Sequence, residues 1–302
     1  MEGEKKRVAF LSVLAAVFLT SFKFFIGIVT GSLGILSEAL HSGIDLIAAV
    51  ITFLSVRVSD KPADFDHNYG HGKIENISAL AETILLLVTC FWIILEAYRR
   101  LASGHTHIDV TVWSYVVVIS SIIIDFSRSR ALYRVARKHN SQALEADALH
   151  FSTDIWSSVV VLLGLICANF GLYIADPVAA LGVAIVVLTV SYRLGKRAVD
   201  VLLDKAPPDI VRKVRQMLDS YPEVIHFHSL KVRTAGADTF IKFNIHLKPY
   251  LSLRKVHELC DRIERDIRSR IPRSEIYIHA EPQDIDHLLA EEAELADQQA
   301  VR

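Results

Sequence analysis

Two His–Asp pairs lie inside long apolar segments of this sequence. The first pair is His41 and Asp45, and the second is His150 and Asp154. Residues four apart share one face of a helix, so each pair would present an imidazole beside a carboxylate. Ionisable groups at the depth of a bilayer are costly, and they face a partner or a water-filled cavity. If the two helices meet, the pairs supply two nitrogen and two oxygen ligands, a set that suits a tetrahedral zinc ion.

Polar packing between helices is the alternative explanation for these pairs, because His and Ser often form interhelical hydrogen bonds. A single pair would suit either explanation, whereas the same spacing in two apolar segments favours a metal site. Three nearby carboxylates receive other roles. Glu38 and Asp147 are predicted to lie in a vestibule or at a helix end, and Asp125, close to Arg128 and Arg130, is predicted to form a structural salt bridge.

A polar stretch between two apolar segments, DFDHNYGHGK, carries a second group of possible ligands. Asp64, His67 and His71 lie within eight residues of one another, among glycines that permit tight turns. Imidazole and carboxylate are both zinc ligands, so the stretch is a candidate metal site. The alternative is a solvated surface loop.

Six segments are expected to span a membrane, which takes about 20 mostly apolar residues in a helix. The chain of 302 residues is 52% hydrophobic, and its apolar runs gather in the first two-thirds. The His–Asp pairs fall in the second and fifth segments. The six predicted spans are Val8–Val29, Leu33–Val56, Ile77–Tyr98, Val110–Phe126, Leu149–Phe170 and Pro177–Tyr192.

The distribution of Lys and Arg predicts the orientation of these spans. Basic residues cluster before the first span, between the second and third, after the fourth and after the sixth. The positive-inside rule therefore places both termini in the cytoplasm. The opening MEGEKKR is followed by an apolar run without a small-residue cleavage site, so we interpret this run as a span rather than a removed signal peptide.

The last hundred residues have the pattern of a soluble α+β domain. We expect a helix, two strands, a helix and a strand, at Asp209–Ser220, Val224–Thr234, Thr239–Leu247, Ser252–Arg270 and Glu275–His279. Two helices against a small antiparallel sheet make a ferredoxin-like unit. The predicted domains are a six-helix transmembrane domain at 1–206, a cytoplasmic ferredoxin-like domain at 207–282 and an acidic tail at 283–302.

Composition argues against two other classes of protein. The net charge is −1 and no basic patch interleaved with aromatic residues is present, so nucleic acid is not an expected partner. The three cysteines, Cys90, Cys167 and Cys260, are widely separated, which argues against a disulfide framework and against a CxxC metal site.

The paired HxxxD motifs, the DFDHNYGHGKIE loop, the spans and the soluble tail together resemble the cation diffusion facilitator family of metal–proton antiporters. The resemblance extends from the start of the chain to about Pro282. It implies a metal transport site made of His41, Asp45, His150 and Asp154. It also implies a cytoplasmic loop site made of Asp64, His67 and His71, and a salt bridge between Lys73 and Asp204.

The same resemblance implies that the cytoplasmic domain dimerises and can bind metal. His228, His279 and Glu281 match ligand positions of that domain, and Glu281 stands where relatives use Asp. A strand position that is His in relatives is Asn244 here. His246, two residues later, lies on the same face of a strand and is the candidate replacement.

The resemblance predicts a transporter that exports zinc from the cytoplasm in exchange for protons, as a homodimer in a bilayer, without an organic cofactor. Zinc is favoured because His41 occupies a position that is Asp in many bacterial members and His in zinc-preferring ones. A bacterial inner membrane is the expected location.

Three alternatives are open. The ion could be iron, cobalt, nickel, cadmium or manganese, although imidazole ligands disfavour manganese. An intramembrane metalloenzyme is a second alternative, but four protein ligands close a zinc site and catalytic sites keep a position open. The third is a metal sensor that does not transport.

Overall fold

The computed structural model describes residues 2–31, 33–103, 112–169 and 175–283. The chain divides into two compact units, Met1–Leu202 and Leu203–Arg302, which we describe separately. The predicted acidic tail, apart from residue 283, lies outside the described residues, as do residues 110 and 111 of the fourth predicted span and residue 170 of the fifth.

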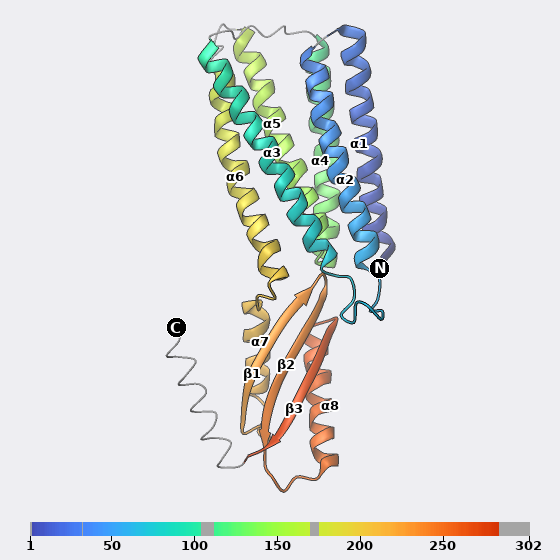
Figure 1. Cartoon of the computed structure of the whole chain (residues 1–302), viewed down its shortest axis with the longest axis vertical. Coiled ribbons are helices and arrows are strands. Elements are labelled where there is room, and N and C mark those ends of the chain that lie inside the picture. The colour runs from blue at the N-terminus through green and yellow to red at the C-terminus, as the bar shows by residue number, and fades with distance from the viewer. Residues whose placement is uncertain (1, 32, 104–111, 170–174, 284–302) are drawn as a thin grey trace. The chain divides into compact units, whose positions relative to one another are not determined.

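Six long helices make up the described part of the first unit, and Figure 1 shows them alongside one another. They are α1 (Glu2–Thr30), α2 (Leu33–Ser59), α3 (Ile74–Ser103), α4 (Val112–His139), α5 (Gln142–Asn169) and α6 (Ala175–Leu202). A helix of this length, about 40 Å, can cross a bilayer.

Three segments within these helices are long and apolar enough to be candidate membrane spans on length and composition. They are Gly3–Thr30, Glu38–Ser59 and Ile74–Arg99, in α1, α2 and α3. The described part of α4 carries Asp125, Arg128 and Arg130, which lower its apolar content. The count of six spans therefore stays a prediction, while the six helices are present.

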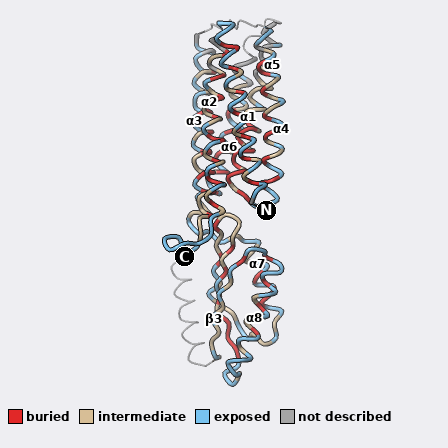
Figure 2. The backbone as a smooth tube through the Cα atoms, turned by 90° about the vertical axis from the view of Figure 1, so that its right-hand side faces the viewer, coloured by how far each residue is buried: buried red, intermediate tan, exposed pale blue. Residues whose placement is uncertain are grey.

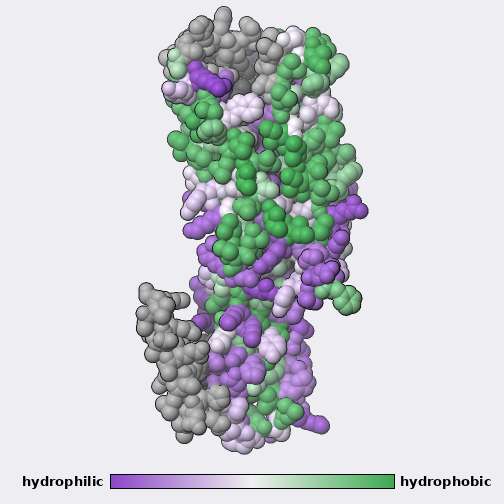
Figure 3. Space-filling model, in the orientation of Figure 1, coloured by the Kyte–Doolittle hydropathy of each residue, from purple (hydrophilic) through white to green (hydrophobic). Residues whose placement is uncertain are grey.

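Apolar side chains cover much of the helical unit on the face shown in Figure 3. On α1 alone, Phe18, Phe25 and Ile28 are each at least 60% exposed. Figure 2 shows buried positions alternating with exposed ones along the long helices. Such an apolar outer surface is what a bilayer solvates and water does not.

The interior of the helical unit consists of two main clusters that share α5. One cluster joins α5 to α1, α2 and α4 and includes Leu132, Leu144 and Phe151; the other joins α5 to α3 and α6 and includes Leu86 and Val187. Many of the buried residues are alanines, and small residues let helix backbones approach closely in membranes. Helix α5 is therefore packed on several sides, which fixes the side chains that it carries.

The second unit contains α7 (Pro208–Leu218), β1 (His226–Ala235), β2 (Asp238–Leu247), α8 (Leu253–Arg270) and β3 (Ser274–Pro282). The strands form one sheet in the order β1-β2-β3. Phe243, Ile245 and Ile263 are fully buried in a core between this sheet and the two helices. The predicted elements agree with these bounds to within a few residues.

The predicted antiparallel sheet is wrong in one respect, because β2 and β3 are parallel. A tight connection at Gly236, with φ of +59°, makes β1 and β2 an antiparallel hairpin. Helix α8 separates β2 from β3, and a helical crossover returns the chain in the same direction. The described order α-β-β-α-β is one strand short of the full ferredoxin-like pattern, so that fold assignment is not confirmed.

Ile263 provides a test of this core. Its side chain is 0% exposed, so Ile263→Ala should destabilise the unit by about 2–5 kcal/mol through lost burial and a cavity. Hydrogen exchange of the β2 and β3 amides in the full-length protein measures this change as local opening. The exposed neighbour Arg265→Ala should leave the same amides within about 0.5 kcal/mol of wild type. Equal protection in both variants would contradict the packing described.

Candidate metal-binding sites

The two His–Asp pairs predicted from the sequence lie side by side in the structure, on α2 and α5. One ligand atom from each of His41, Asp45 and Asp154 lies within 4.8 Å of the other two. His150 is fully buried, and its Nε2 lies 3.0 Å from Asp45 Oδ1 and 3.5 Å from Asp154 Oδ2. His41 Nε2 lies 3.9 Å from Asp154 Oδ1. The four side chains therefore form one cluster.

Each histidine of this cluster approaches a carboxylate of the opposite helix. His150 of α5 contacts Asp45 of α2, and His41 of α2 faces Asp154 of α5. Helix α5 is firmly packed, and Asp45 is 8% exposed. Two imidazoles and two carboxylates in a buried setting can bind a transition metal, and the imidazoles can hold protons in its place.

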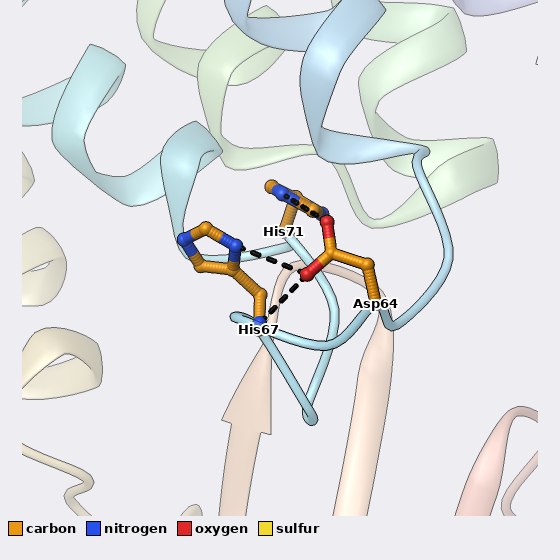
Figure 4. Close-up of side chains that lie close together, drawn as sticks. All are labelled: Asp64, His67 and His71. Atoms are coloured by element: carbon orange, nitrogen blue, oxygen red, sulfur yellow. Dashed lines mark hydrogen bonds and ion pairs between the residues drawn. The ribbon is translucent and has the colours of Figure 1, made fainter.

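The loop between α2 and α3 brings Asp64, His67 and His71 together, as Figure 4 shows. His67 Nδ1 lies 3.2 Å from Asp64 Oδ1, and His71 Nε2 lies 3.5 Å from Asp64 Oδ2. The two imidazole rings are 4.4 Å apart, centroid to centroid. The three side chains face one another, in a geometry from which a shared cation could be held.

Backbone geometry holds this loop in shape. The N–H groups of His67 and Asp66 donate to Asp64 Oδ1 at 2.7 and 3.1 Å, and Gly70 turns the chain with a φ of +73°. The donation from the His67 backbone is the main reason that the pKa of Asp64 lies below its ordinary value. The Asp64 carboxylate is therefore ionised at neutral pH, as a metal ligand must be.

A third cluster lies on the sheet of the second unit and consists of His228, His246 and Glu281. Glu281 Oε2 lies 3.3 Å from His228 Nε2 and 3.5 Å from His246 Nε2. Strand register explains the meeting, because β2 places His246 opposite Glu281 of β3. Asn244 shares this face and donates to Glu281 Oε1 at 2.9 Å.

Two further histidines border this third cluster. His279 Nε2 lies 3.1 Å from Glu281 Oε1, and its side chain is 54% exposed. His226 was missed by the sequence analysis. Its ring lies 6.3 Å from that of His228 and 6.2 Å from that of His246, because β1 pairs it with His246. The alternation of histidines in His226-Phe227-His228 was the signal that could have revealed it.

Asp147, which was predicted to lie in a vestibule or at a helix end, is near the start of α5. It is 0% exposed, and Ser12 Oγ donates to its Oδ2 at 3.3 Å. Although α5 begins only five residues earlier, side chains from α1 and α4 cover this turn. Arg128 of α4 donates to the same Ser12 at 3.1 Å, which links α1, α4 and α5 through polar groups.

The predicted salt bridge of Asp125 is confirmed. Its Oδ1 lies 3.2 Å from an Arg128 guanidinium nitrogen, and both side chains are at most 8% exposed. The guanidinium also lies over the ring of Phe151, 3.5 Å from the centroid, which adds a cation–π contact. Arg128 therefore compensates a carboxylate beside the turn that carries His150.

Several buried ionisable residues of the other helices were missed. Lys5 contacts Asp60 and Glu75, Lys23 contacts Ser42 and Glu38, and Glu82 accepts a hydrogen bond from Thr52. Lys23 and Glu82 lie inside predicted spans. The rule that singled out the His–Asp pairs, an ionisable residue in an apolar segment, applies equally to these two.

The predicted Lys73–Asp204 salt bridge would connect the two units and stays a prediction. Within the first unit, Lys73 Nζ donates to the backbone oxygen of Leu202 at 3.4 Å. Within the second, Asp204 Oδ2 lies 3.5 Å from an Arg233 guanidinium nitrogen.

Comparison with known protein families gives two adjoining matches. Residues 9–203 match the model of a cation efflux transmembrane domain, and residues 206–283 match that of the cytoplasmic domain of cation efflux proteins. Together the two models cover most of the chain.

Curated relatives match over nearly the same length. The cation-efflux pump FieF of Yersinia enterocolitica is 33% identical over 291 residues, which cover 93% of this chain and 95% of the relative. The cation-efflux pump FieF of Shigella boydii is 33% identical over 281 residues, with 91% and 92% of the two chains covered.

Two similar solved structures each cover 26% of the chain. The zinc form of the transporter CzrB is 30% identical and covers 26% of this chain and 89% of its own, with a TM-score of 0.25. The metal-bound C-terminal domain of the CzcD transporter from Thermotoga maritima is 26% identical and covers 26% and 92%, also with a TM-score of 0.25.

Substitution of Arg128 tests the buried polar network around α5. Arg128→Met would leave Asp125 and Asp147 without the guanidinium that compensates them. We expect a loss of about 3–5 kcal/mol in stability, visible as a lower thermal unfolding temperature in detergent. Arg137→Met is the matched control, because Arg137 is exposed on the same helix. If both variants unfolded at the wild-type temperature, the buried polar network would make no contribution to the stability of the protein, contrary to this prediction.

Proposed function

Because the chain belongs to the cation diffusion facilitator family of membrane transporters, which move divalent metal cations and are not enzymes, we propose that it exports zinc from the cytoplasm in exchange for protons. The convergence of His41, Asp45, His150 and Asp154 between α2 and α5 is the observation that carries this proposal. We assign these four residues as the ligands of the transported ion.

The choice of zinc follows from the chemistry of the ligands. Two imidazole nitrogens and two carboxylate oxygens suit a four-coordinate zinc ion. Two carboxylates also offset the charge of a divalent cation in a buried site. The name of the FieF relatives specifies cation efflux without a particular metal, so iron, cobalt, nickel, cadmium and manganese are the competing hypotheses.

Proton exchange follows from the position of the two histidines. A neutral imidazole binds the cation, whereas a protonated one repels it and attracts the carboxylates. His150 lies between Asp45 and Asp154, so a proton on its ring would hold both carboxylates after the metal has left. A proton on His41, whose Nε2 lies 3.9 Å from Asp154 Oδ1, would likewise attract that carboxylate. Exchange of zinc for protons therefore keeps the buried site close to neutral.

Transport requires that this site open alternately to the two sides of the membrane, as in other secondary transporters. In this proposal α1 to α6 all span the membrane, and both termini lie in the cytoplasm. The domain limits are 1–206 for the transmembrane part, 207–282 for the cytoplasmic part and 283–302 for the tail. The relatives from Yersinia and Shigella favour a bacterial inner membrane as the location.

The remaining two clusters are proposed as accessory sites on the cytoplasmic side. Asp64, His67 and His71 would bind metal in the loop between α2 and α3. In the cytoplasmic domain, His228, His246 and Glu281 would bind metal, with His279 beside them. The match to the cytoplasmic-domain model supports a homodimer formed through this domain.

Removal of either intramembrane carboxylate tests the transport site. Asp45→Ala and Asp154→Ala should each abolish zinc flux into proteoliposomes, because an anionic ligand is lost and a buried imidazole loses its partner. Glu96→Gln is the matched control, a carboxylate on α3 outside the cluster, and should transport normally. Near-normal flux in both aspartate variants would refute the assignment, and flux of another metal but not zinc would correct the ion.

His41 tests the selectivity. His41→Asp replaces a nitrogen ligand by an oxygen ligand, so the site should discriminate less between zinc and cadmium. The ratio of the initial rates of the two metals, measured in the same proteoliposomes, should shift toward cadmium. A ratio equal to that of the wild type would show that His41 does not set the preference.

A further inference from the structure

Lys23 is a buried ammonium group inside the apolar helix α1. Its side chain is 5% exposed and lies within the candidate span Gly3–Thr30. Nζ donates to Ser42 Oγ at 2.8 Å and to Glu38 Oε2 at 3.1 Å, both on α2. A lysine at such a position is costly to insert into a membrane, and residues of this kind usually serve a function.

The partner Ser42 belongs to the turn of α2 that carries two of the transport ligands. It follows His41 directly and precedes Asp45 by three residues, so Ser42 and Asp45 are neighbours on the helix surface. A second bond from α1 holds the same residue, since Thr20 Oγ1 donates to the Ser42 backbone oxygen at 2.9 Å. Helix α1 thus brings a positive charge to the ligand-bearing turn and fixes it there.

The charge of Lys23 is less completely balanced than that of Arg128, a buried cation of α4. Arg128 is paired with Asp125, whose side chain is 8% exposed. Glu38, the carboxylate beside Lys23, has a side chain that is 44% exposed and can be hydrated, so it screens the ammonium poorly at the buried side. Part of the field of Lys23 therefore reaches the site that holds Asp45 and Asp154.

We propose that Lys23 is a resident counter-charge of the transport site, which weakens the hold of the site on its cation and so permits release. The proposal rests on the proposed transport function and adds a residue that is not a ligand. Without the metal, the Lys23 ammonium, which is bonded to Ser42, partly offsets the negative charge of the Asp45 and Asp154 carboxylates. With the metal bound, the same ammonium repels it. Lys23 is a positioning and tuning residue that acts through charge and through Ser42.

Neutralisation of Lys23 should therefore tighten binding and slow turnover. A unit charge within about 10 Å of a divalent ion, in surroundings of intermediate dielectric constant, changes its affinity by about tenfold or more. We expect Lys23→Met to lower the KM for Zn²⁺ about tenfold and to lower kcat as release becomes limiting. Lys23→Arg keeps the charge and should restore both constants toward wild type.

The experiment measures Zn²⁺ flux over a range of Zn²⁺ concentrations, with the full-length protein in proteoliposomes. Wild type, Lys23→Met, Lys23→Gln and Lys23→Arg are compared, after their thermal unfolding in detergent has been recorded. Lys23→Gln retains a polar group that can bond Ser42, so it reports on the charge even where Lys23→Met folds poorly. A lower KM in the neutral variants, with recovery in Lys23→Arg, supports the counter-charge.

Other outcomes separate this proposal from the function on which it rests. The neutral variants could instead show a reduced kcat, an unchanged KM and a lower unfolding temperature. That result would mean that Lys23 has a purely structural role, and it would overturn the counter-charge proposal. An unchanged KM and kcat would overturn it as well. Absence of Zn²⁺ flux in the wild-type protein would instead contradict the proposed zinc transport itself.

Discussion

The high energy of an uncompensated charge in an apolar interior governs the arrangement of the helical unit. His150 contacts two carboxylates, Arg128 pairs with Asp125, and Lys23 bonds to Ser42 and Glu38. His150 joins α5 to α2, Lys23 joins α1 to α2, and Arg128 joins α4 to α1 through its bond to Ser12. The same charges that would destabilise an isolated helix in a membrane thus determine which helices lie together and in what register.

Helix α5 shows how packing and chemistry depend on each other. Its apolar residues join both clusters of the interior, so the helix is confined by α1, α2, α4, α3 and α6. One of its turns carries Asp147 and His150, which are fully buried, and Phe151, which lies beneath the Arg128 guanidinium. A side chain on a helix held from several sides has little freedom, and this preorganisation favours one geometry of the bound ion.

The approach of α2 to α5 was implied by the resemblance to the family, whereas helical periodicity and hydropathy were sufficient to predict the six long helices and to place each i,i+4 pair on one helix face. They could not predict that Lys23 and Asp147 are buried, since burial depends on which neighbouring helix covers each turn. In the second unit the strands were located from alternation, but the direction of β3 depends on the crossover through α8. The meeting of His246 with Glu281 likewise required the strand register, which a single strand does not encode.

The alternation of β2 also limits where a ligand can stand on the cytoplasmic sheet. Asn244 and His246 share a face and both reach Glu281, although they are about 7 Å apart along the strand. A histidine can therefore shift by two residues and still reach the same carboxylate, whereas a shift of one residue would point it into the apolar core at Ile245. The outer face of the sheet therefore offers ligand positions at every second residue. A binding site can move between these positions during evolution by single substitutions, while the core on the other face is preserved.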